Sequence, residues 1–234
     1  MPTLVATSDV HSPKYLGLLR EAVAAYRGEP DLVILAGDLV NKGRVEEIDR
    51  VLEEVEKLGA PIVAVFGNEE YDSVKEELVD RCGGRVTWLD DSAVEVRLGG
   101  ETVSIVGSRG SLLRPTTWQA RHVPGIERVY AERIERIDEL LSSRRARYTV
   151  LVTHYAPTFS TLVGEDRRIW SRLGHPRLEA VIRRRAPDVV IHGHAHNGRR
   201  KASVGGVPVY NVALPLWRSL VEVRLEPRGL EALL

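Results

Sequence analysis

Apolar and polar positions alternate along the first seventy residues in blocks that predict strands and helices in turn. Three apolar runs have the length of buried strands: residues 4–7, 32–36 and 62–66. Between them, apolar residues recur at three- and four-residue steps, as on one face of a helix, within residues 16–26 and 45–58. Ser12 and Pro13 precede the first of these helices and fit its cap and first position. The opening unit is therefore β-α-β-α-β, which predicts parallel strands joined by crossover helices.

The rest of the chain adds strands that make the predicted sheets mixed. Apolar stretches at residues 94–98 and 102–106 flank two glycines and predict a hairpin. Residues 109–124 show no clear period and predict a loop, which leads into a helix with an apolar stripe at residues 129–141. Further strands are expected at residues 148–153, 189–192, 207–213 and 220–225. We expect an α/β fold of two facing mixed β-sheets in a sandwich flanked by α-helices, formed by residues 1–234 as a single domain.

Composition removes several classes of protein. Hydrophobic residues make up 43% and charged residues 28%, which excludes a disordered or fibrous chain. The 33 basic and 33 acidic residues cancel, which argues against general adhesion to nucleic acid. The single cysteine, Cys82, excludes an intramolecular disulfide and a thiolate zinc site, and fits a reducing compartment. Without a membrane-length apolar run or a hydrophobic signal core, the sequence predicts a cytoplasmic protein.

Potential metal ligands stand where the predicted strands end. They are Asp9, His11, Asp38, Asn68, His154, His194 and His196. Any one of them alone is more simply a turn residue, a helix cap or a core histidine. The carboxyl ends of parallel strands face one crevice, however, so these separate segments would bring their side chains to a common place. Three histidines within residues 192–196 would repel one another if protonated, which favours a cation among them.

The number and type of these ligands predict two metal ions. Seven side chains are too many for one tetrahedral zinc but suit two ions that share a bridging carboxylate. Imidazole suits transition metals, so the mixed nitrogen and oxygen set favours Mn, Fe, Zn or Ni over Ca or Mg, and we favour Mn. His192 would point to the same side as His194 on an extended chain. We expect it in the core or behind the ligands rather than among them.

The ordered motifs Asp9-x-His11, Gly37-Asp38, Gly67-Asn68, His154 and Gly193-His194-x-His196 resemble those of the calcineurin-like metallophosphoesterases. The resemblance implies a four-layer fold with two facing mixed sheets between helices. It also implies that one metal is held by Asp9, His11, Asp38 and His196. The other would be held by Asp38, Asn68, His154 and His194, with Asp38 as the bridge.

Two metals about 3.5 to 4 Å apart lower the pKa of a bridging water enough to supply hydroxide near neutral pH, for in-line attack on phosphorus. The function expected is therefore a dinuclear-metal phosphoesterase that needs no Ser or Cys nucleophile, with Asp38 and Glu69 as its catalytic residues. Many family members have His after the Gly-Asn pair, thought to protonate the leaving oxygen, whereas this chain has Glu69 followed by Glu70.

Glu69 favours diesters as substrates. A carboxylate beside two cations stays ionised and repels a phosphate dianion more than a diester monoanion. The resemblance agrees, because a small prokaryotic branch that lacks this histidine is associated with phosphodiesterase activity on aryl substrates. A raised pKa of Glu69 would still allow it to act as an acid.

Candidate substrate contacts lie in the segments after two strands: Arg109, Trp118, Tyr155 and Arg167. Arginine and aromatic side chains can clamp phosphate and stack a base. A small phosphoester, with nucleotide-derived diesters as one candidate, is thus the expected partner, without a membrane. Three alternatives stay open: a phosphomonoesterase, a metal-binding interaction scaffold with weak turnover, and a nuclease on long DNA, which the neutral net charge disfavours. The sequence leaves the native metal and the oligomeric state open.

Overall fold

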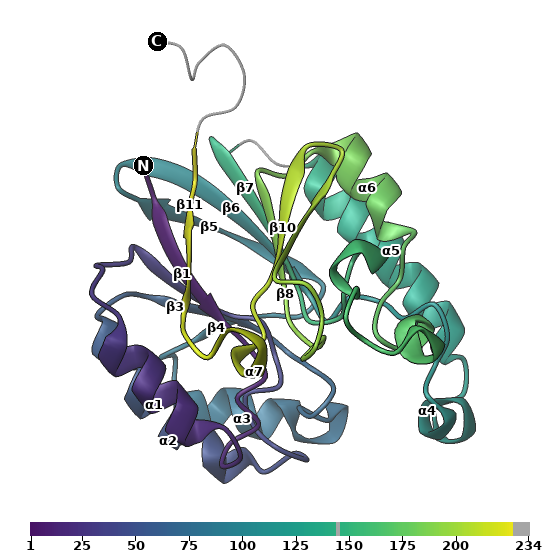
Figure 1. Cartoon of the computed structure of the whole chain (residues 1–234), viewed down its shortest axis with the longest axis horizontal. Coiled ribbons are helices and arrows are strands. Elements are labelled where there is room, and N and C mark those ends of the chain that lie inside the picture. Colours follow the sequence, from purple (N-terminus) through teal and green to yellow (C-terminus); the bar gives the residue numbers. More distant parts are fainter. Residues whose placement is uncertain (144–145, 227–234) are drawn as a thin grey trace.

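The computed structural model describes residues 1–143 and 146–226, and two mixed β-sheets face each other at its centre (Figure 1). The first sheet has the order β11-β1-β2-β3-β4. Its strands β1 to β4 are parallel, and β11 pairs antiparallel with β1. Their bounds are β1 Thr3–Thr7, β2 Leu32–Leu35, β3 Ile62–Val65, β4 Thr87–Leu89 and β11 Val221–Arg224.

The second sheet has the order β5-β6-β7-β8-β10-β9. Its four central strands are parallel, and an antiparallel strand closes each edge. The strand bounds are β5 Ser92–Leu98, β6 Glu101–Ser108, β7 Tyr148–Thr153, β8 Val189–His192, β9 Lys201–Val204 and β10 Val207–Asn211. Strands β5 and β6 form the hairpin predicted around Gly99 and Gly100.

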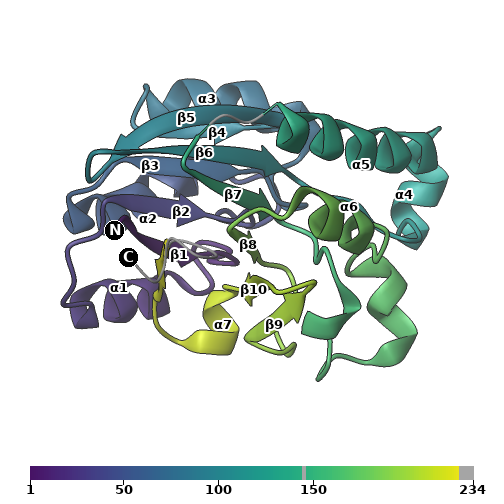
Figure 2. The ribbon, with the colours of Figure 1, turned by 90° about the horizontal axis from the view of Figure 1, so that it is seen from above.

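Helices cover the outer face of each sheet, as Figure 1 and the view from above in Figure 2 show. Helices α1, α2 and α3 pack on the first sheet, and α5 and α6 on the second. Their bounds are α1 Leu16–Ala25, α2 Ile48–Val55, α3 Lys75–Cys82, α5 Ile126–Ser142 and α6 Leu178–Arg185. The expected four-layer α/β sandwich is confirmed.

The core between the sheets is built from strands that are apolar on both faces, because each is covered by a helix layer outside and by the other sheet inside. Leu4, Ile34 and Val65 of the first sheet pack against Ile105 and Val150 of the second. Burial of such side chains contributes roughly 1.5–3 kcal/mol each. This core fixes the strand ends relative to one another, and the loops at those ends carry the polar clusters.

The sequence pattern misses or misplaces some short elements. Residues 109–124 are not all loop, because α4 spans Thr117–His122. Thr116 and Gln119 form a capping box there. This cap, and not an apolar stripe, stabilises the start of the helix. Helix α1 begins at Leu16, not at Pro13, and the Ser12 hydroxyl donates to Glu47 at 2.7 Å instead of capping it.

Strands β4 and β9 and the one-turn helix α7, Leu214–Trp217, are too short to give a period and are also missed. Over residues 1–143 and 146–226, no helix combines the length and the apolar character that crossing a bilayer requires.

Candidate metal centre

The loops after five parallel strands bring polar side chains to one edge of the sandwich. Asp9, Asp38 and Asn68 follow β1, β2 and β3 of the first sheet, and His154 and His194 follow β7 and β8 of the second. The seven residues expected as ligands fall into two clusters there. Asp9, His11 and His196 form one, and Asp38, His154 and His194 the other, with the ligand atoms of each cluster within 4.8 Å of one another. Asn68 lies beside the second cluster, its Oδ1 3.1 Å from Nε2 of His154.

The first cluster is tied together by the Asp9 carboxylate. His196 Nε2 lies 3.0 Å from Asp9 Oδ1, and His11 Nε2 lies 3.4 Å from His196 Nε2. The other oxygen of Asp9 accepts the backbone N–H of His194 at 2.9 Å and the Ser8 hydroxyl at 2.5 Å. One carboxylate therefore joins two segments that are far apart in the sequence, residues 8–11 and 194–196.

Asp38 reaches both clusters with the same oxygen. Its Oδ2 lies 3.3 Å from Nε2 of His154 and 3.7 Å from Nε2 of His11. In the second cluster, His154 Nε2 is 3.1 Å from Nδ1 of His194. The position of Asp38 is the one that a carboxylate shared by two cations would occupy.

The donor set of both clusters fits divalent transition metals. In each cluster two imidazole nitrogens face each other, an arrangement that needs a proton or a cation between them. Burial alone would lower the pKa of His154, but the Asp38 carboxylate outweighs it and raises the pKa to about 9. Burial and the neighbouring His154 lower the pKa of His194 to about 3. A cation can take the place of the proton on His154, since metal binding displaces protons from its ligands.

Hydrogen bonds made by the other ring nitrogen orient the histidine side chains of the site and fix their tautomers. Nδ1 of His154 lies 2.9 Å from the carbonyl oxygen of Ala36, so it carries the proton and leaves Nε2 for the cluster. His192 is fully buried, and its Nδ1 donates to the Gly193 carbonyl at 2.8 Å. It belongs to neither ligand cluster.

The backbone at the site is held in a costly conformation. Asp9, His11, Asp38 and His194 all have positive φ values, between 43° and 70°. For residues other than glycine this left-handed region is sparsely populated, and each instance costs of order 1–3 kcal/mol. Such strain persists where surrounding contacts over-determine the conformation, and it concentrates at functional sites.

Glu69 and Glu70 point in different directions. Glu70 is fully buried, and its carboxylate accepts backbone N–H groups of the two loops that carry Asp38 and Asn68. Burial and the charge of Asp38 raise the pKa of Glu70 to about 7. Glu69 instead accepts the backbone N–H of Lys42 at 2.7 Å, and it is not among the residues that line the adjoining cavity. Its own N–H donates to Asp38 Oδ1 at 2.8 Å, so the main chain at position 69 still orients the shared carboxylate.

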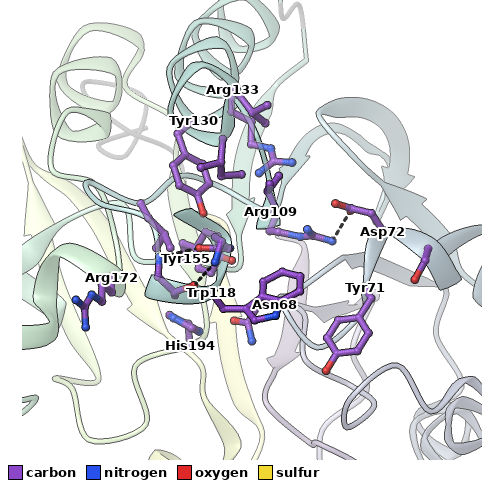
Figure 3. Close-up of a pocket in the computed structure, with 17 residues that line it drawn as sticks. Asn68, Tyr71, Asp72, Arg109, Trp118, Tyr130, Arg133, Tyr155, Arg172 and His194 are labelled. Carbon is purple, nitrogen blue, oxygen red and sulfur yellow. Dashed lines mark hydrogen bonds and ion pairs between the residues drawn. The ribbon is translucent and has the colours of Figure 1, made fainter. Parts of the chain in front are cut away.

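A cavity of about 810 Å³ opens beside the clusters, and Asn68 and His194 form part of its wall (Figure 3). Of the four expected substrate residues, Arg109, Trp118 and Tyr155 line it. Arg167 does not, because its exposed guanidinium lies over the Trp170 ring, 5.6 Å from the ring centroid. Arg172, at the other end of the same 3-10 helix (Arg167–Arg172), does line the cavity, and the sequence gives no means of predicting which of the two does.

The structure adds cavity residues that sequence reasoning missed, among them Tyr71, Asp72 and Tyr130. Tyr130 lies on the buried side of α5 and so reads as a core residue in the sequence. Asp72 follows the Glu69-Glu70 pair and forms an ion pair with Arg109 at 3.1 Å. Burial alone would raise the pKa of Asp72, but Arg109 and Lys75 lower it below its ordinary value.

Known proteins resemble this chain over most of its length. A probable cyclic nucleotide phosphodiesterase of Synechococcus sp. is 29% identical over 210 residues, 86% of this chain and 74% of that protein. An uncharacterized Bacillus subtilis protein, YpbG, is 26% identical over 202 residues, 84% of this chain and 62% of its own length.

Solved structures share the fold. A phosphopantetheinyl hydrolase from Mycobacterium tuberculosis has a TM-score of 0.73 at 17% identity, covering 97% of this chain and 98% of that one. A dimetal phosphatase from Danio rerio has a TM-score of 0.61 at 13% identity, covering 90% and 86%. The profile of the calcineurin-like phosphoesterases matches residues 2–198, from the first strand through the last predicted ligand. The chain belongs to the calcineurin-like phosphoesterase family.

Proposed function

We propose that this protein hydrolyses small phosphodiesters with the help of two divalent transition-metal ions, manganese being the favoured metal, as one catalytic domain. Nucleotide-derived diesters are the substrates we favour, since the Synechococcus relative is described as a probable cyclic nucleotide phosphodiesterase. A reducing, cytoplasmic compartment belongs to the same proposal, because the single cysteine is a buried thiol.

The position of Asp38 Oδ2 between the two ligand clusters carries this proposal. An oxygen 3.3 Å from one cluster histidine and 3.7 Å from another suits a carboxylate shared by two cations. We assign Asp9, His11 and His196 to one ion, Asn68, His154 and His194 to the other, and Asp38 to both. Two cations held in this way activate a water as the nucleophile and neutralise charge on the phosphoryl oxygens.

The side chains around the clusters hold this arrangement in place. Tyr155 is only 2% exposed, and its ring centroid lies 5.4 Å from that of His154 and 4.9 Å from that of His194. The guanidinium of Arg109 donates to the Glu70 carbonyl at 2.9 Å, which steadies the loop that carries Asn68. These contacts hold the ligand side chains in place, which matters because catalysis tolerates only small errors in the position of its groups.

A carboxylate in the cavity wall supports a diester preference. Asp72 lies in the cavity wall with its side chain 73% exposed, and Glu69 stands next to Asn68. The Asp72 carboxylate would repel a phosphate dianion more strongly than a diester monoanion, whereas the Glu69 carboxylate accepts the Lys42 N–H outside the cavity wall. Arg109, Arg133 and Arg172 supply positive charge to the same wall for the phosphate, and Asp72 is ion-paired with Lys75 at 3.0 Å and with Arg109 at 3.1 Å.

The proposal is tested by comparing hydrolysis of bis(4-nitrophenyl) phosphate and 4-nitrophenyl phosphate with added Mn²⁺. We expect the diester to be cleaved faster, and Asp38→Asn to abolish both activities. Asp80→Asn, which alters an exposed carboxylate on α3, is the matched control and should keep wild-type rates.

Equal or reversed rates on the two esters would overturn the diester preference and favour a phosphomonoesterase. No turnover with any transition metal would favour a metal-binding scaffold. Activity that survives Asp38→Asn would show that this carboxylate is not shared by two ions.

A further inference from the structure

The cavity beside the ligand clusters is continuous with them, because His194 of the second cluster and Asn68 beside it are part of the cavity wall. The side of the cavity opposite the clusters is lined by side chains from residues 112–133, a range that includes α4 and the first half of α5. A phosphoester bound at the clusters would therefore project its organic group into this space. The volume of about 810 Å³ is within the range of drug-sized ligand pockets, about 300–1,000 Å³.

The wall of the cavity is mainly apolar and aromatic. Val123, Ile126 and Val129 are only partly buried, and all three line the cavity. Four aromatic residues also line it: Tyr71, Trp118, Tyr130 and Tyr155. Such a surface suits a flat ring, since aromatic faces stack on any π-system.

Two buried polar groups in this wall have no partner among the described residues. The Tyr130 hydroxyl is one, on a residue that is 3% exposed, and Nε of Arg109, 9% exposed, is the other. Figure 3 shows the Tyr130 hydroxyl directed toward the part of the cavity where Tyr155 lies. Buried polar groups are nearly always hydrogen-bonded, so the missing acceptors point to a ligand that supplies them.

The position of Trp118 is a third feature of the cavity that favours an aromatic ligand. Its side chain is 63% exposed on α4 and stacks on His122, with ring centroids 4.9 Å apart. Helix α4 lies at the outer end of α5, away from the sheets (Figure 1). An indole at the rim of an apolar cavity can lie over a ring that enters it.

We propose that this cavity selects the substrate by its organic group, and that it takes a planar heteroaromatic ring carrying hydrogen-bond acceptors, the chemistry of a nucleobase. The Tyr130 hydroxyl and the Arg109 Nε–H donate to the ring's acceptors, and Trp118 covers its face. The inference rests on the proposed phosphodiesterase function, because the clusters provide the phosphate end of the same site.

Binding of free adenosine tests the cavity without any reaction, since adenosine has no phosphate to lose. Its dissociation constant is measured by isothermal titration calorimetry on the Mn²⁺-supplemented protein, with ribose as the comparison that lacks the heteroaromatic base. We expect Tyr130→Phe to weaken adenosine binding about 3- to 10-fold, the scale of one hydrogen bond. Trp118→Ala should weaken it about 10-fold or more, the scale of one stacked base.

Val163→Ala is the matched control, because Val163 is 45% exposed and is not part of the cavity wall. It should bind adenosine like wild type, and ribose should bind at least 10-fold more weakly than adenosine. Equal binding of adenosine by wild type, Tyr130→Phe and Trp118→Ala would overturn the inference, as would ribose binding as tight as adenosine.

The same variants separate this inference from the proposed function. Adenosine binding that depends on Tyr130 and Trp118, without hydrolysis of any phosphoester, would reject the phosphodiesterase and keep the cavity assignment. Hydrolysis of bis(4-nitrophenyl) phosphate, with adenosine binding unchanged in both variants, would keep the phosphodiesterase and reject the cavity assignment.

Discussion

The carboxylate of Glu70 accepts the backbone N–H of Asp38 at 2.9 Å from a fully buried position. The same carboxylate accepts the N–H groups of Leu39 at 2.7 Å, Val40 at 3.1 Å and Gly67 at 2.6 Å. One buried carboxyl group thus joins the loop after β2 to the loop after β3. The relative positions of Asp38 and Asn68 depend on it.

Glu70→Gln should weaken both the fold and the metal centre. An amide has only one oxygen, so its NH₂ group would face backbone N–H donors and at least one of them would lose its acceptor. We expect a fall in the free energy of unfolding of about 2–4 kcal/mol, since each buried unpaired group costs about 1–3 kcal/mol. Urea unfolding and Mn²⁺ titration calorimetry measure the two effects. Glu76→Gln, on the exposed face of α3, is the control, and equal losses in both variants would show that Glu70 has no special role.

Gly67→Ala should displace the Asp38 carboxylate together with the backbone that carries it. A Cβ at position 67 would collide with Asp38 Oδ1 and its backbone nitrogen. We expect Mn²⁺ affinity and diester hydrolysis to fall at least about 10-fold, because catalysis tolerates little misplacement of its groups. Gly17→Ala is the control, since nothing lies within 4 Å of a Cβ there and it should stabilise α1 by about 0.5–1 kcal/mol. Unchanged metal affinity in Gly67→Ala would mean that the Asp38 carboxylate has room to move.

Glu69→His should raise activity on esters with poor leaving groups. The substitution supplies the proton donor that many family members have at this position, and general acid catalysis contributes about 10²–10⁴-fold. We expect at least a 10-fold gain on an alkyl ester of a nucleotide and little change on bis(4-nitrophenyl) phosphate, whose leaving group needs no proton.

Glu69→Gln separates the acid from the structural contact, because its amide oxygen can still accept the Lys42 N–H. This variant should keep the wild-type ratio of rates on the two esters if Glu69 is not an acid. If Glu69→His has the same rates as wild type on both esters, position 69 lies outside the reaction path.

The sequence predicts the ligand clusters better than it predicts the cavity. Asp9, Asp38 and His194 each follow a strand whose apolar run is clear, and the carboxyl ends of parallel strands meet, so their convergence can be argued from local patterns. No comparable rule predicts which residues line the cavity. Tyr130 is on the apolar stripe of α5, where a core residue and a cavity residue look alike.

The order of the strands within a sheet also cannot be predicted from the local sequence pattern. Strand β10 pairs with β8 on one side and β9 on the other, although β9 comes first in the chain. Nothing in the residues of β10 specifies this, because the order depends on which apolar faces cover each other in the finished sandwich. Arg167 shows the same limit, since its distance from the cavity depends on the path of the chain after β7.

The stability of the second helix layer should depend on pH through Asp138. Its carboxylate accepts from Arg185 Nε at 2.7 Å and lies 2.8 Å from Arg184, so it joins α5 to α6. The hydrogen bond with Arg185 lowers the pKa of Asp138 to about 2. A folded-state pKa below the unfolded value means that the pair stabilises the fold above about pH 4 and loses this effect as the pH falls through 2.

Asp138→Asn should therefore reduce the free energy of unfolding at pH 7 by about 1 kcal/mol, a modest value because the carboxylate is 22% exposed and its partners more so. The difference from wild type should shrink between pH 4 and pH 2, which urea unfolding at a series of pH values would measure. Asp80→Asn serves again as the exposed control. A difference between wild type and Asp138→Asn that stays constant down to pH 2 would mean that packing between α5 and α6, rather than the charge of Asp138, accounts for the loss.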